Sequence, residues 1–438
     1  MKILSIGSDK KLFDENSEVR RRIIEYGQLV DELHIVVFTN NKLKIGNWKL
    51  KIAKNVFLYP TNSSSRWFYV FDAVKIGARI IRNLKLEIGN SRNNIIVSCQ
   101  DPFECGLVGW LLKRKFSARG GSASGGKIPL QLQIHTDFLS PYFWKESLLN
   151  KIRVLVAKFL IPRADCIRVV SRRIKLSLSE AKIFPKNRRC GRTKFSRSEN
   201  FRDKRFLEEV FAEHCLAVLP IWVDIEKIKN TPTKTNLHDK YPQFDFIILM
   251  ASRLTKEKNI GLAIEALRDT NLRIHANDTN NANKKNIGLI IVGAGPEENN
   301  LKSKIKNLKL YDNVILEPWT DDIISYYKTA DLFLMTSDYE GYGMAVVEAM
   351  ASGCPVVMTD VGLAGEVLID KKDGLVVPVG NKEKLTEAIL NLIENSELRA
   401  ELIRNSQKTL SFWPKKEDYL KAYRDSWFYC AEYIDVRG

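Results

Sequence analysis

The sequence has 438 residues, a length that predicts two domains rather than a single core. Hydrophobic residues make up 45% of it and charged residues 28%, a balance that excludes a disordered or fibrous chain. No apolar run approaches the roughly 18 residues of a membrane span, and the N-terminus does not resemble a secretory signal. The seven cysteines show no CxxC spacing, so we expect reduced thiols in a cytoplasmic protein.

Charge is distributed unevenly along the chain, whose formal net charge is +17. Residues 1–250 hold 45 Lys and Arg against 24 Asp and Glu, whereas the remainder holds 24 against 28. A basic half indicates a surface that meets phosphate groups, whether of nucleic acid, anionic lipid or a lipid-linked substrate. Lysines that only keep the protein solvated are the alternative.

In the first half, short apolar runs alternate with amphipathic stretches. Strands are predicted at Lys2–Gly7, Leu33–Phe38, Val56–Tyr59, Ile95–Ser98, Leu130–His135 and Cys166–Ser171. Helices are predicted between them, at Val19–Leu29, Trp67–Leu84 and Phe103–Phe116. Strands that are apolar throughout and separated by helices are typical of a parallel sheet covered on both faces.

The second half repeats this alternation. Strands are predicted at Phe246–Ala251, Leu289–Gly293, Val314–Leu316, Leu332–Thr336, Val356–Thr359 and Leu375–Val379. Two such series predict an α/β protein with two doubly wound, Rossmann-like domains, whose ligands lie beyond the carboxyl ends of the strands.

Domain boundaries follow from composition. The polar segment 231–242, with two prolines, separates a first domain at 1–230 from a second at 231–410. A basic insertion that is poor in hydrophobic residues is expected at about 180–212 within the first domain. Residues 411–438 are rich in aromatic residues and predict a final helix beyond Pro414.

The segment 332–360 reads LFLMTSDYEGYGMAVVEAMASGCPVVMTD and combines a buried strand, a loop and a helix that begins near Met344. Gly341 and Gly343 allow a phosphate to approach the backbone, next to the N–H groups and positive dipole of the helix N-terminus. Glu340 and Glu348 lie in the loop and on the helix. A carboxylate in the apolar run AVVEAM needs a donor, and a ribose diol supplies two hydroxyl groups.

A second pair of charges follows the first strand of this half. The run FIILMASRLTKEK places Arg253 and Lys258 after that strand. Because the carboxyl ends of parallel strands share one edge of the sheet, both cations are expected beside Glu340, where they would neutralise a diphosphate. Surface charges at a loop are the alternative for either residue alone.

These residues resemble a known family. The runs ASRLTKEKN, IIVGAGPE, EGYGMAVVEAMASGCPVV and VGLAGEVLIDKKDGLVVP are similar to those of the retaining glycosyltransferases of family 4. The Glu-x7-Glu and Arg-x4-Lys elements occur in the family's order, and the resemblance extends over Phe246–Asn395. It implies the GT-B fold, in which two Rossmann-like domains face a central cleft and a C-terminal helix crosses back to the first, acceptor-side domain.

The resemblance also implies roles for the second-domain residues. Glu348 would hold the ribose of a nucleotide-sugar, Arg253 and Lys258 its phosphates, and Glu340 the donor sugar. Other donor-binding candidates are the backbone at Gly341, Tyr342, Gly343 and Met344, and Trp319 and Thr320 near the base. Trp319 could equally be a core aromatic. The sequence contains no Asp-x-Asp, so no metal or other cofactor is expected, and the basic groups would stabilise the leaving group instead.

The first half offers fewer candidates. His135 follows a predicted strand, and the resemblance implies a place near the reacting sugar; a purely structural histidine is the alternative. Asp101 and Glu104 follow another strand and would contact the acceptor or cap the next helix. The family's Gly-Gly loop is absent, and Ser17 and Arg20 could replace it at a helix N-terminus.

A membrane surface is a further expected partner. Residues 151–205 hold 18 Lys and Arg against 4 Asp and Glu. The stretch Lys151–Ile161 has apolar residues interrupted by Arg153 and Lys158, as in a helix that lies in a membrane interface. We therefore expect reversible, peripheral association with the inner face of the membrane. A helix that only covers the sheet is the alternative.

The sequence thus predicts a retaining, metal-independent glycosyltransferase. It would move a sugar from a nucleotide-sugar donor to a hydroxyl of a glycan or lipid-linked acceptor, in cell-envelope or polysaccharide biosynthesis. A basic nucleic-acid-binding protein is one alternative, although no nucleic acid is expected because the sequence has no signature of an RNA- or DNA-binding module. Another GT-B enzyme, such as a nucleotide-sugar epimerase, is the second.

Overall fold

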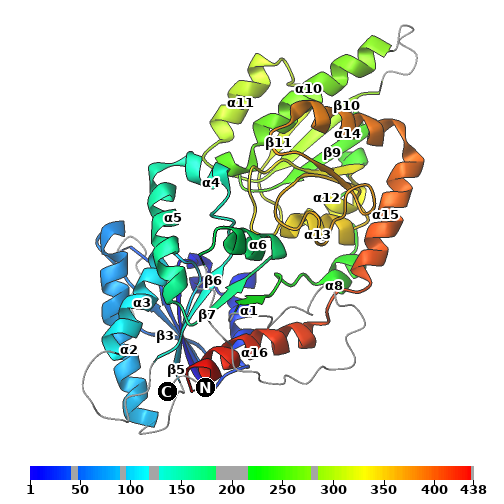
Figure 1. Cartoon of the computed structure of the whole chain (residues 1–438). Coiled ribbons are helices and arrows are strands. Elements are labelled where there is room, and N and C mark those ends of the chain that lie inside the picture. The colour runs from blue at the N-terminus through cyan, green and yellow to red at the C-terminus, as the bar shows by residue number, and fades with distance from the viewer. Residues whose placement is uncertain (41–47, 89–94, 118–127, 184–215, 278–284, 436–438) are drawn as a thin grey trace. The chain divides into compact units, whose positions relative to one another are not determined.

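The computed structural model describes residues 1–40, 48–88, 95–117, 128–183, 216–277 and 285–435 (Figure 1). The chain forms two compact units. Unit 1 comprises Met1–Leu139, Ser147–Pro220 and Pro414–Gly438, and unit 2 comprises Ser140–Glu146 and Ile221–Trp413. Most of the basic insertion predicted at 180–212 lies outside the described residues. The polar segment 231–242 lies within unit 2, because helix α8 (Ile225–Asn230) packs against α13 (Met344–Ala351) of that unit.

Unit 1 is built on an eight-stranded sheet in the order β3-β4-β2-β1-β5-β6-β7-β8. Its strands are β1 (Lys2–Gly7), β2 (Glu32–Val37), β3 (Leu50–Ala53), β4 (Val56–Pro60), β5 (Ile95–Cys99), β6 (Leu130–Ile134), β7 (Cys166–Val169) and β8 (Leu216–Val218). All neighbours are parallel except β3 and β4. The six predicted strands are confirmed. The sequence analysis missed β3, a short and half-exposed edge strand, and the three-residue β8.

Helices cover both faces of this sheet. They are α1 (Glu18–Gly27), α2 (Tyr69–Ile88), α3 (Glu104–Ser117), α5 (Leu148–Leu160), α6 (Arg172–Glu180) and α16 (Lys416–Asp435). Short 3-10 helices are η1 (Lys10–Phe13), η2 (Arg66–Phe68) and η3 (Ile161–Arg163). Crossovers between parallel strands are right-handed, so α2, α3 and α5, which all connect strands in one direction across the sheet, lie on the same face. They pack side by side in that order (Figure 1).

The C-terminal helix α16 packs against β5 and β6 of unit 1. Tyr26 on α1 stacks on Tyr423 with ring centroids 4.0 Å apart, and Trp427 is buried. The amide of Gln131 on β6 donates to the Ser426 carbonyl oxygen at 2.8 Å. The aromatic residues of the C-terminal segment therefore complete the core of the unit that contains the N-terminus.

Unit 2 contains a six-stranded parallel sheet in the order β11-β10-β9-β12-β13-β14. Its strands are β9 (Phe246–Ala251), β10 (Ile287–Val292), β11 (Val314–Glu317), β12 (Leu332–Met335), β13 (Val356–Thr359) and β14 (Leu375–Val377). All six were predicted. The strand order reverses between β9 and β12, which makes their carboxyl ends the switch point of the sheet.

The helices of unit 2 flank this sheet. Besides α8 and α13 they are α4 (Pro141–Glu146), α9 (Leu237–Lys240), η4 (Lys256–Lys258), α10 (Ile260–Asn277), α11 (Glu298–Asn307), α12 (Ile323–Thr329), α14 (Lys382–Glu394) and α15 (Ser396–Leu410). The central strands are buried along their whole length, which explains why they read as continuous apolar runs. Among the described residues, neither unit has a helix long and apolar enough to cross a membrane.

Candidate functional site

The loops that follow β9 and β12 lie next to each other at the switch point of unit 2. The two strands are parallel neighbours, paired at Leu332 with Ile248 and at Phe333 with Leu249. The chain leaves β9 towards α10 and leaves β12 towards α13, so the two loops diverge around a crevice. Ligands of doubly wound sheets bind at this place.

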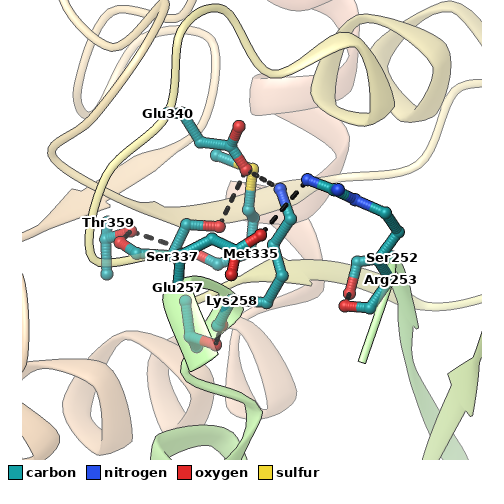
Figure 2. Close-up of polar contacts among 9 residues, drawn as sticks. Ser252, Arg253, Glu257, Lys258, Met335, Ser337, Glu340 and Thr359 are labelled. Atoms are coloured by element: carbon teal, nitrogen blue, oxygen red, sulfur yellow. Dashed lines mark hydrogen bonds and ion pairs between the residues drawn. The ribbon is translucent and has the colours of Figure 1, made fainter. Parts of the chain in front are cut away.

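An ion pair joins the two loops (Figure 2). The Lys258 ammonium contacts Oε1 of Glu340, and the Ser337 hydroxyl donates to the same oxygen at 2.9 Å. Both charged side chains are largely buried, with exposed fractions of 15% for Lys258 and 14% for Glu340. The predicted convergence of these two residues is therefore present, and Ser337 is a partner that the sequence analysis did not identify.

Backbone contacts hold the loops at a fixed separation. The Thr336 hydroxyl donates to the carbonyl oxygens of Lys258 at 2.9 Å and Asn259 at 3.0 Å. The Asn259 amide donates to Oδ1 of Asp338 at 2.8 Å. Asn259 has a φ of 43°, a left-handed conformation that asparagine tolerates better than most residues. The sequence signal for this turn is the asparagine immediately after Lys258.

Arg253 occupies a different environment from Lys258. Its side chain is 74% exposed, and its guanidinium donates to Glu257 at 3.2 Å from the same loop (Figure 2). An exposed ion pair of this kind contributes little to stability. Of the two predicted cations, Lys258 is thus already engaged with Glu340, whereas Arg253 extends into solvent.

The N-terminus of α13 lacks a side-chain cap. Its N-cap residue is Gly343, with a φ of 101° that favours glycine, and Met344 begins the helix. The backbone on the other side of the loop is close as well, since a Cβ at Gly362 would lie 2.3 Å from the Tyr342 carbonyl oxygen. Gly341 is buried in this loop. The first turn of α13 therefore presents N–H groups without a capping side chain, an arrangement suited to an anion.

Glu348 lies one turn further along α13 and is half-buried. The Tyr327 hydroxyl donates to its Oε2 at 3.3 Å. Burial raises the pKa of Glu348, and the hydrogen bond from Tyr327 partly opposes that rise. No described residue donates to its other oxygen, so one acceptor of this carboxylate remains for a ligand.

Trp319 and Thr320, which were predicted to lie near the base of the nucleotide, follow β11. Trp319 is 59% exposed and is therefore not a core aromatic. Thr320 Oγ1 accepts from the backbone N–H of Asp322 at 3.1 Å. The Glu317 carboxylate is held by Lys240 at 2.8 Å and by the Tyr326 hydroxyl at 2.7 Å. Glu317 thus fixes the end of β11, and Trp319 is left as an accessible aromatic surface beyond it.

In unit 1, His135 follows β6 and interacts with its neighbour on the same strand. Its Nε2 lies 3.2 Å from Oε1 of Gln133, and NH2 of Arg168 donates to that same oxygen at 2.5 Å. A guanidinium can only donate, so the Gln133 oxygen must face Arg168 and can only accept from His135. His135 is therefore the tautomer that carries its proton on Nε2, and its Nδ1 is an acceptor.

The same network continues to the C-terminal helix. The Gln133 amide donates to Ser98 at 2.8 Å, and Ser98 donates to Gln131 at 2.9 Å. Gln131 and Arg168 then both donate to α16, to the Ser426 carbonyl at 2.8 Å and the Tyr423 hydroxyl at 3.0 Å. The hydrogen-bond network that begins at His135 thus ends on a helix nearly 300 residues away in the sequence, whereas the contact between Arg168 and Gln133 sets the tautomer of the histidine.

The charge state of His135 follows from its surroundings. The imidazole reaches solvent, yet the protein around it desolvates the charged form and, with the cations of Arg168 and Arg22, lowers its pKa to about 3. The ring is therefore neutral near pH 7. It can exchange hydrogen bonds with a ligand but does not supply a positive charge.

The four remaining first-half candidates have structural partners within unit 1. Asp101 accepts from the backbone N–H groups of Phe103 at 2.8 Å and Cys105 at 3.2 Å, as a helix cap does, and burial raises its pKa. Glu104 forms a two-pronged ion pair with Arg153.

Ser17 and Arg20 belong to the N-terminal turn of α1. Ser17 caps the helix by accepting from the Arg20 N–H at 3.1 Å, and its hydroxyl donates to the Lys11 carbonyl at 2.6 Å. The Arg20 guanidinium lies 3.3 Å from Glu15. The Ser17 side chain is therefore used within the protein.

Residues 234–409 match the family model described as "Glycosyl transferases group 1". The matched residues all lie within unit 2. The matched stretch contains both loops of the switch point and the whole of α13. The stretch that matches the family model therefore includes the Lys258–Glu340 pair, Arg253, Glu348 and the exposed Trp319.

Two curated relatives match part of the chain. Over 151 residues it is 31% identical to the poly(glycerol-phosphate) alpha-glucosyltransferase of Bacillus subtilis, a match that covers 34% of this chain and 22% of that protein. Over 183 residues it is 30% identical to the N-acetylgalactosamine-N,N'-diacetylbacillosaminyl-diphospho-undecaprenol 4-alpha-N-acetylgalactosaminyltransferase of Campylobacter jejuni, covering 42% and 46%. The chain thus spans less than half the length of either relative.

A solved structure matches along almost the whole chain. The crystal structure of HepE from Anabaena in complex with UDP covers 98% of this chain and 100% of its own, with a TM-score of 0.65 at 18% identity. At this identity the likeness establishes the fold and nothing further. The fold is GT-B, as the resemblance of the sequence to the glycosyltransferases of family 4 predicts.

Proposed function

We propose that this protein is a retaining, metal-independent glycosyltransferase that uses a nucleotide-sugar donor. The observation that carries the proposal is the convergence of Lys258 and Glu340 at the switch point, beside the uncapped N-terminus of α13. Support comes from the group 1 match over this region and from the UDP-bound neighbour of the same fold.

The donor would use the acceptors and donors that the site leaves available. Glu348 has one carboxylate oxygen for a ribose hydroxyl, and Trp319 offers an exposed aromatic face to the base. The diphosphate would lie between Arg253 and the first turn of α13, where the helix dipole favours negative charge. Lys258 would gain the diphosphate as a second anionic partner while Glu340 turns to the sugar.

The reaction requires stabilisation of a leaving nucleoside diphosphate. The bond between the anomeric carbon and the diphosphate breaks as a bond to the acceptor oxygen forms on the same face. The acceptor proton passes to a phosphate oxygen of the departing diphosphate. Arg253, Lys258 and the N–H groups of α13 supply positive potential where negative charge develops, the part that a metal ion plays in other transferases. In unit 1, the Nδ1 atom of neutral His135 is an acceptor for a ligand hydroxyl.

The acceptor is proposed from the names of the relatives. One acts on poly(glycerol phosphate) and the other on a diphospho-undecaprenol, so both names describe phosphate-containing, envelope-type acceptors. The basic half of the chain suits an acceptor of this chemistry. We therefore place the reaction in cell-envelope polysaccharide biosynthesis.

A thermal-shift panel of nucleoside diphosphates and nucleotide-sugars, with and without EDTA, tests donor recognition. Stabilisation by one nucleotide class, unchanged by EDTA, is expected. Glu348→Ala should mainly weaken donor binding, and Arg253→Ala should lower turnover. Full transfer activity in both variants would contradict the proposal.

The same assay separates the alternative functions. Consumption of a nucleotide-sugar without any acceptor would indicate an epimerase. Filter binding of RNA or DNA in preference to any nucleotide-sugar would indicate a nucleic-acid-binding protein.

A further inference from the structure

We propose that the outer face of the helix layer α2–α3–α5 in unit 1 binds an anionic lipid bilayer. This face is the surface of that layer turned away from the sheet. The three helices lie on the same side of the sheet and pack in the order α2, α3, α5 (Figure 1). Exposed side chains on the sides of these helices that face away from the sheet therefore belong to a single surface.

Helix α5 presents an apolar stripe on its outer side. Residues spaced by four, three and four positions share one helical face and are all exposed: Leu148 (77%), Ile152 (57%), Leu155 (59%) and Phe159 (41%). The opposite face is buried against unit 1 through Asn150, Val154, Ala157 and Leu160. The stripe is therefore not the core-facing side of the helix, and the described residues leave it uncovered.

Helix α2 adds a second apolar group. Trp67 in the preceding turn is 93% exposed and lies one turn from the exposed Phe71, whereas Leu86 is exposed near the other end of the helix. Large apolar side chains that are exposed in a cluster mark an interaction surface more often than scattered ones do. A tryptophan and a phenylalanine at the start of a helix are of the kind that enters the interfacial region of a bilayer.

Cations surround these apolar groups. The exposed cations of the layer are Lys75, Arg79, Arg82, Arg114, Lys115, Lys158 and Arg163. Among the described side chains of the three helices, the carboxylates are Asp72 and Glu104, and neither is exposed. Arg153, which the sequence analysis had assigned to membrane binding, instead neutralises Glu104. Helix α2 also contains Glu87, whose side chain lies outside those described, so the layer has seven exposed cations against three carboxylates.

Several of these cations lie over aromatic rings. Arg163 stacks 3.7 Å from the ring centre of Phe159, and Lys75 lies 4.2 Å from that of Phe71. The Phe159 ring meets Trp110 of α3 edge-on, with centroids 5.2 Å apart. Side chains arranged in this way place apolar atoms in the acyl region while their charges reach the headgroups.

The combination of exposed apolar side chains with cations on one surface favours a lipid over another polyanion or a protein. A nucleic acid would use the cations but gain nothing from exposed leucine and isoleucine side chains. A protein partner would need an acidic surface matched to a convex layer of separate apolar residues. An anionic bilayer satisfies both, because each cation near its surface and each buried apolar group contributes to binding.

The inference deepens the proposed function, and its meaning for catalysis rests on that function. A transferase held at the bilayer would meet a lipid-linked acceptor in the plane of the membrane. Vesicle binding itself needs no turnover, so the surface can be tested whether or not the chain transfers sugars.

The test is co-sedimentation of the full-length protein with vesicles of phosphatidylcholine alone or mixed with phosphatidylglycerol. We expect binding to the mixed vesicles at about 0.05 M salt and its loss at about 0.5 M. Ile152→Ser with Leu155→Ser should weaken it about tenfold, as should Arg82→Glu with Lys115→Glu. Matched controls in unit 2, Leu272→Ser and Lys306→Glu with Lys408→Glu, should bind as the unmodified protein does.

Four results would overturn the proposal. They are equal binding to neutral vesicles, absence of binding, equal losses in the unit 2 controls, and an effect of the α5 variant on self-association alone. Binding of RNA that displaces the vesicles and is insensitive to the α5 variant would assign the surface to nucleic acid instead. Nucleotide-induced thermal shifts measured on the same variants separate a failure of this surface from a failure of the donor site.

Discussion

The Lys258 ammonium and the Glu340 carboxylate form an ion pair across the switch point of unit 2, although 82 residues separate them in the chain. Because both side chains are largely buried, each is the main compensation for the charge of the other. The pair is neutral as a whole. Attraction of a diphosphate to this crevice therefore depends on Arg253 and on the N-terminus of α13.

The Lys258–Glu340 pair should show strong energetic coupling. Lys258→Met leaves Glu340 with Ser337 as its hydrogen-bond partner, so we expect a loss of about 1–3 kcal/mol in unfolding free energy. The double variant Lys258→Met with Glu340→Gln should recover part of this loss, since no charge is then left unpaired. Urea unfolding of the four proteins measures the coupling.

An exposed pair on α11 provides the control. Lys302 and Glu298 lie 2.6 Å apart with 58% and 43% of their side-chain surface in solvent, so Lys302→Met should change stability by less than about 0.5 kcal/mol. Additive losses in the Lys258 and Glu340 variants would show that the two charges are compensated separately.

Much of the fold follows from the sequence because apolar runs report burial directly. Two strands of unit 2, Phe246–Ala251 and Val356–Thr359, match their predicted bounds, and both are buried throughout. The missed strands lack this signal. Leu50–Ala53 is an edge strand with half-exposed side chains, and Leu216–Val218 is too short to show a pattern.

Only part of the candidate site could be predicted from the sequence in this way. Placing Arg253, Lys258 and Glu340 on one edge required only the rule that parallel strands share their carboxyl ends. That Lys258 rather than Arg253 contacts Glu340 depends on the left-handed turn at Asn259, which a charge pattern does not encode. The link from α16 to His135 joins segments nearly 300 residues apart and needs the packed structure.

The protonation of His135 should follow the network described above. In a nitrogen-15-labelled sample the ring should carry its proton on Nε2 and should not titrate between pH 8 and 5, because its pKa is lowered to about 3. Arg168→Met removes a nearby positive charge and frees the Gln133 amide to rotate. The pKa should then rise, while burial and Arg22 still keep it below the ordinary value of about 6.5, and both tautomers should appear.

Tyr423→Phe serves as the control for Arg168→Met. It removes one acceptor of the guanidinium but leaves the contact between Arg168 and Gln133, so the histidine signals should stay as they are. With five histidines in the chain, His135→Gln identifies the signal. Protonation on Nδ1 in the unmodified protein, or titration near 6.5, would contradict the assigned network.

Binding of a nucleoside diphosphate should depend on the raised pKa of Glu348. If the ionised carboxylate accepts from a ribose hydroxyl, affinity should be full at neutral pH and fall as pH drops through that pKa, above the range of an ordinary glutamate. Tyr327→Phe removes the hydrogen bond that opposes the rise, so the fall should move to higher pH. Glu348→Gln should bind more weakly and lose this dependence. Calorimetric titrations across pH, with the nucleotide that gives the largest thermal shift, check all three.

Two glycines at opposite ends of α13 separate backbone strain from ligand recognition. Gly343 at the N-terminus and Gly353 at the C-terminus have φ angles of 101° and 79°, and an added Cβ meets only ordinary contacts at the first and nothing within 4 Å at the second. Alanine at either position should therefore cost about 1–2 kcal/mol of stability through the left-handed conformation.

Only Gly343→Ala should also weaken nucleoside diphosphate binding, by about tenfold, because it alters the turn that presents the N–H groups of the helix. Urea unfolding and calorimetric titration on the two variants measure both quantities, and an equal loss of affinity in Gly353→Ala would show that strain in α13, rather than its N-terminus, governs binding.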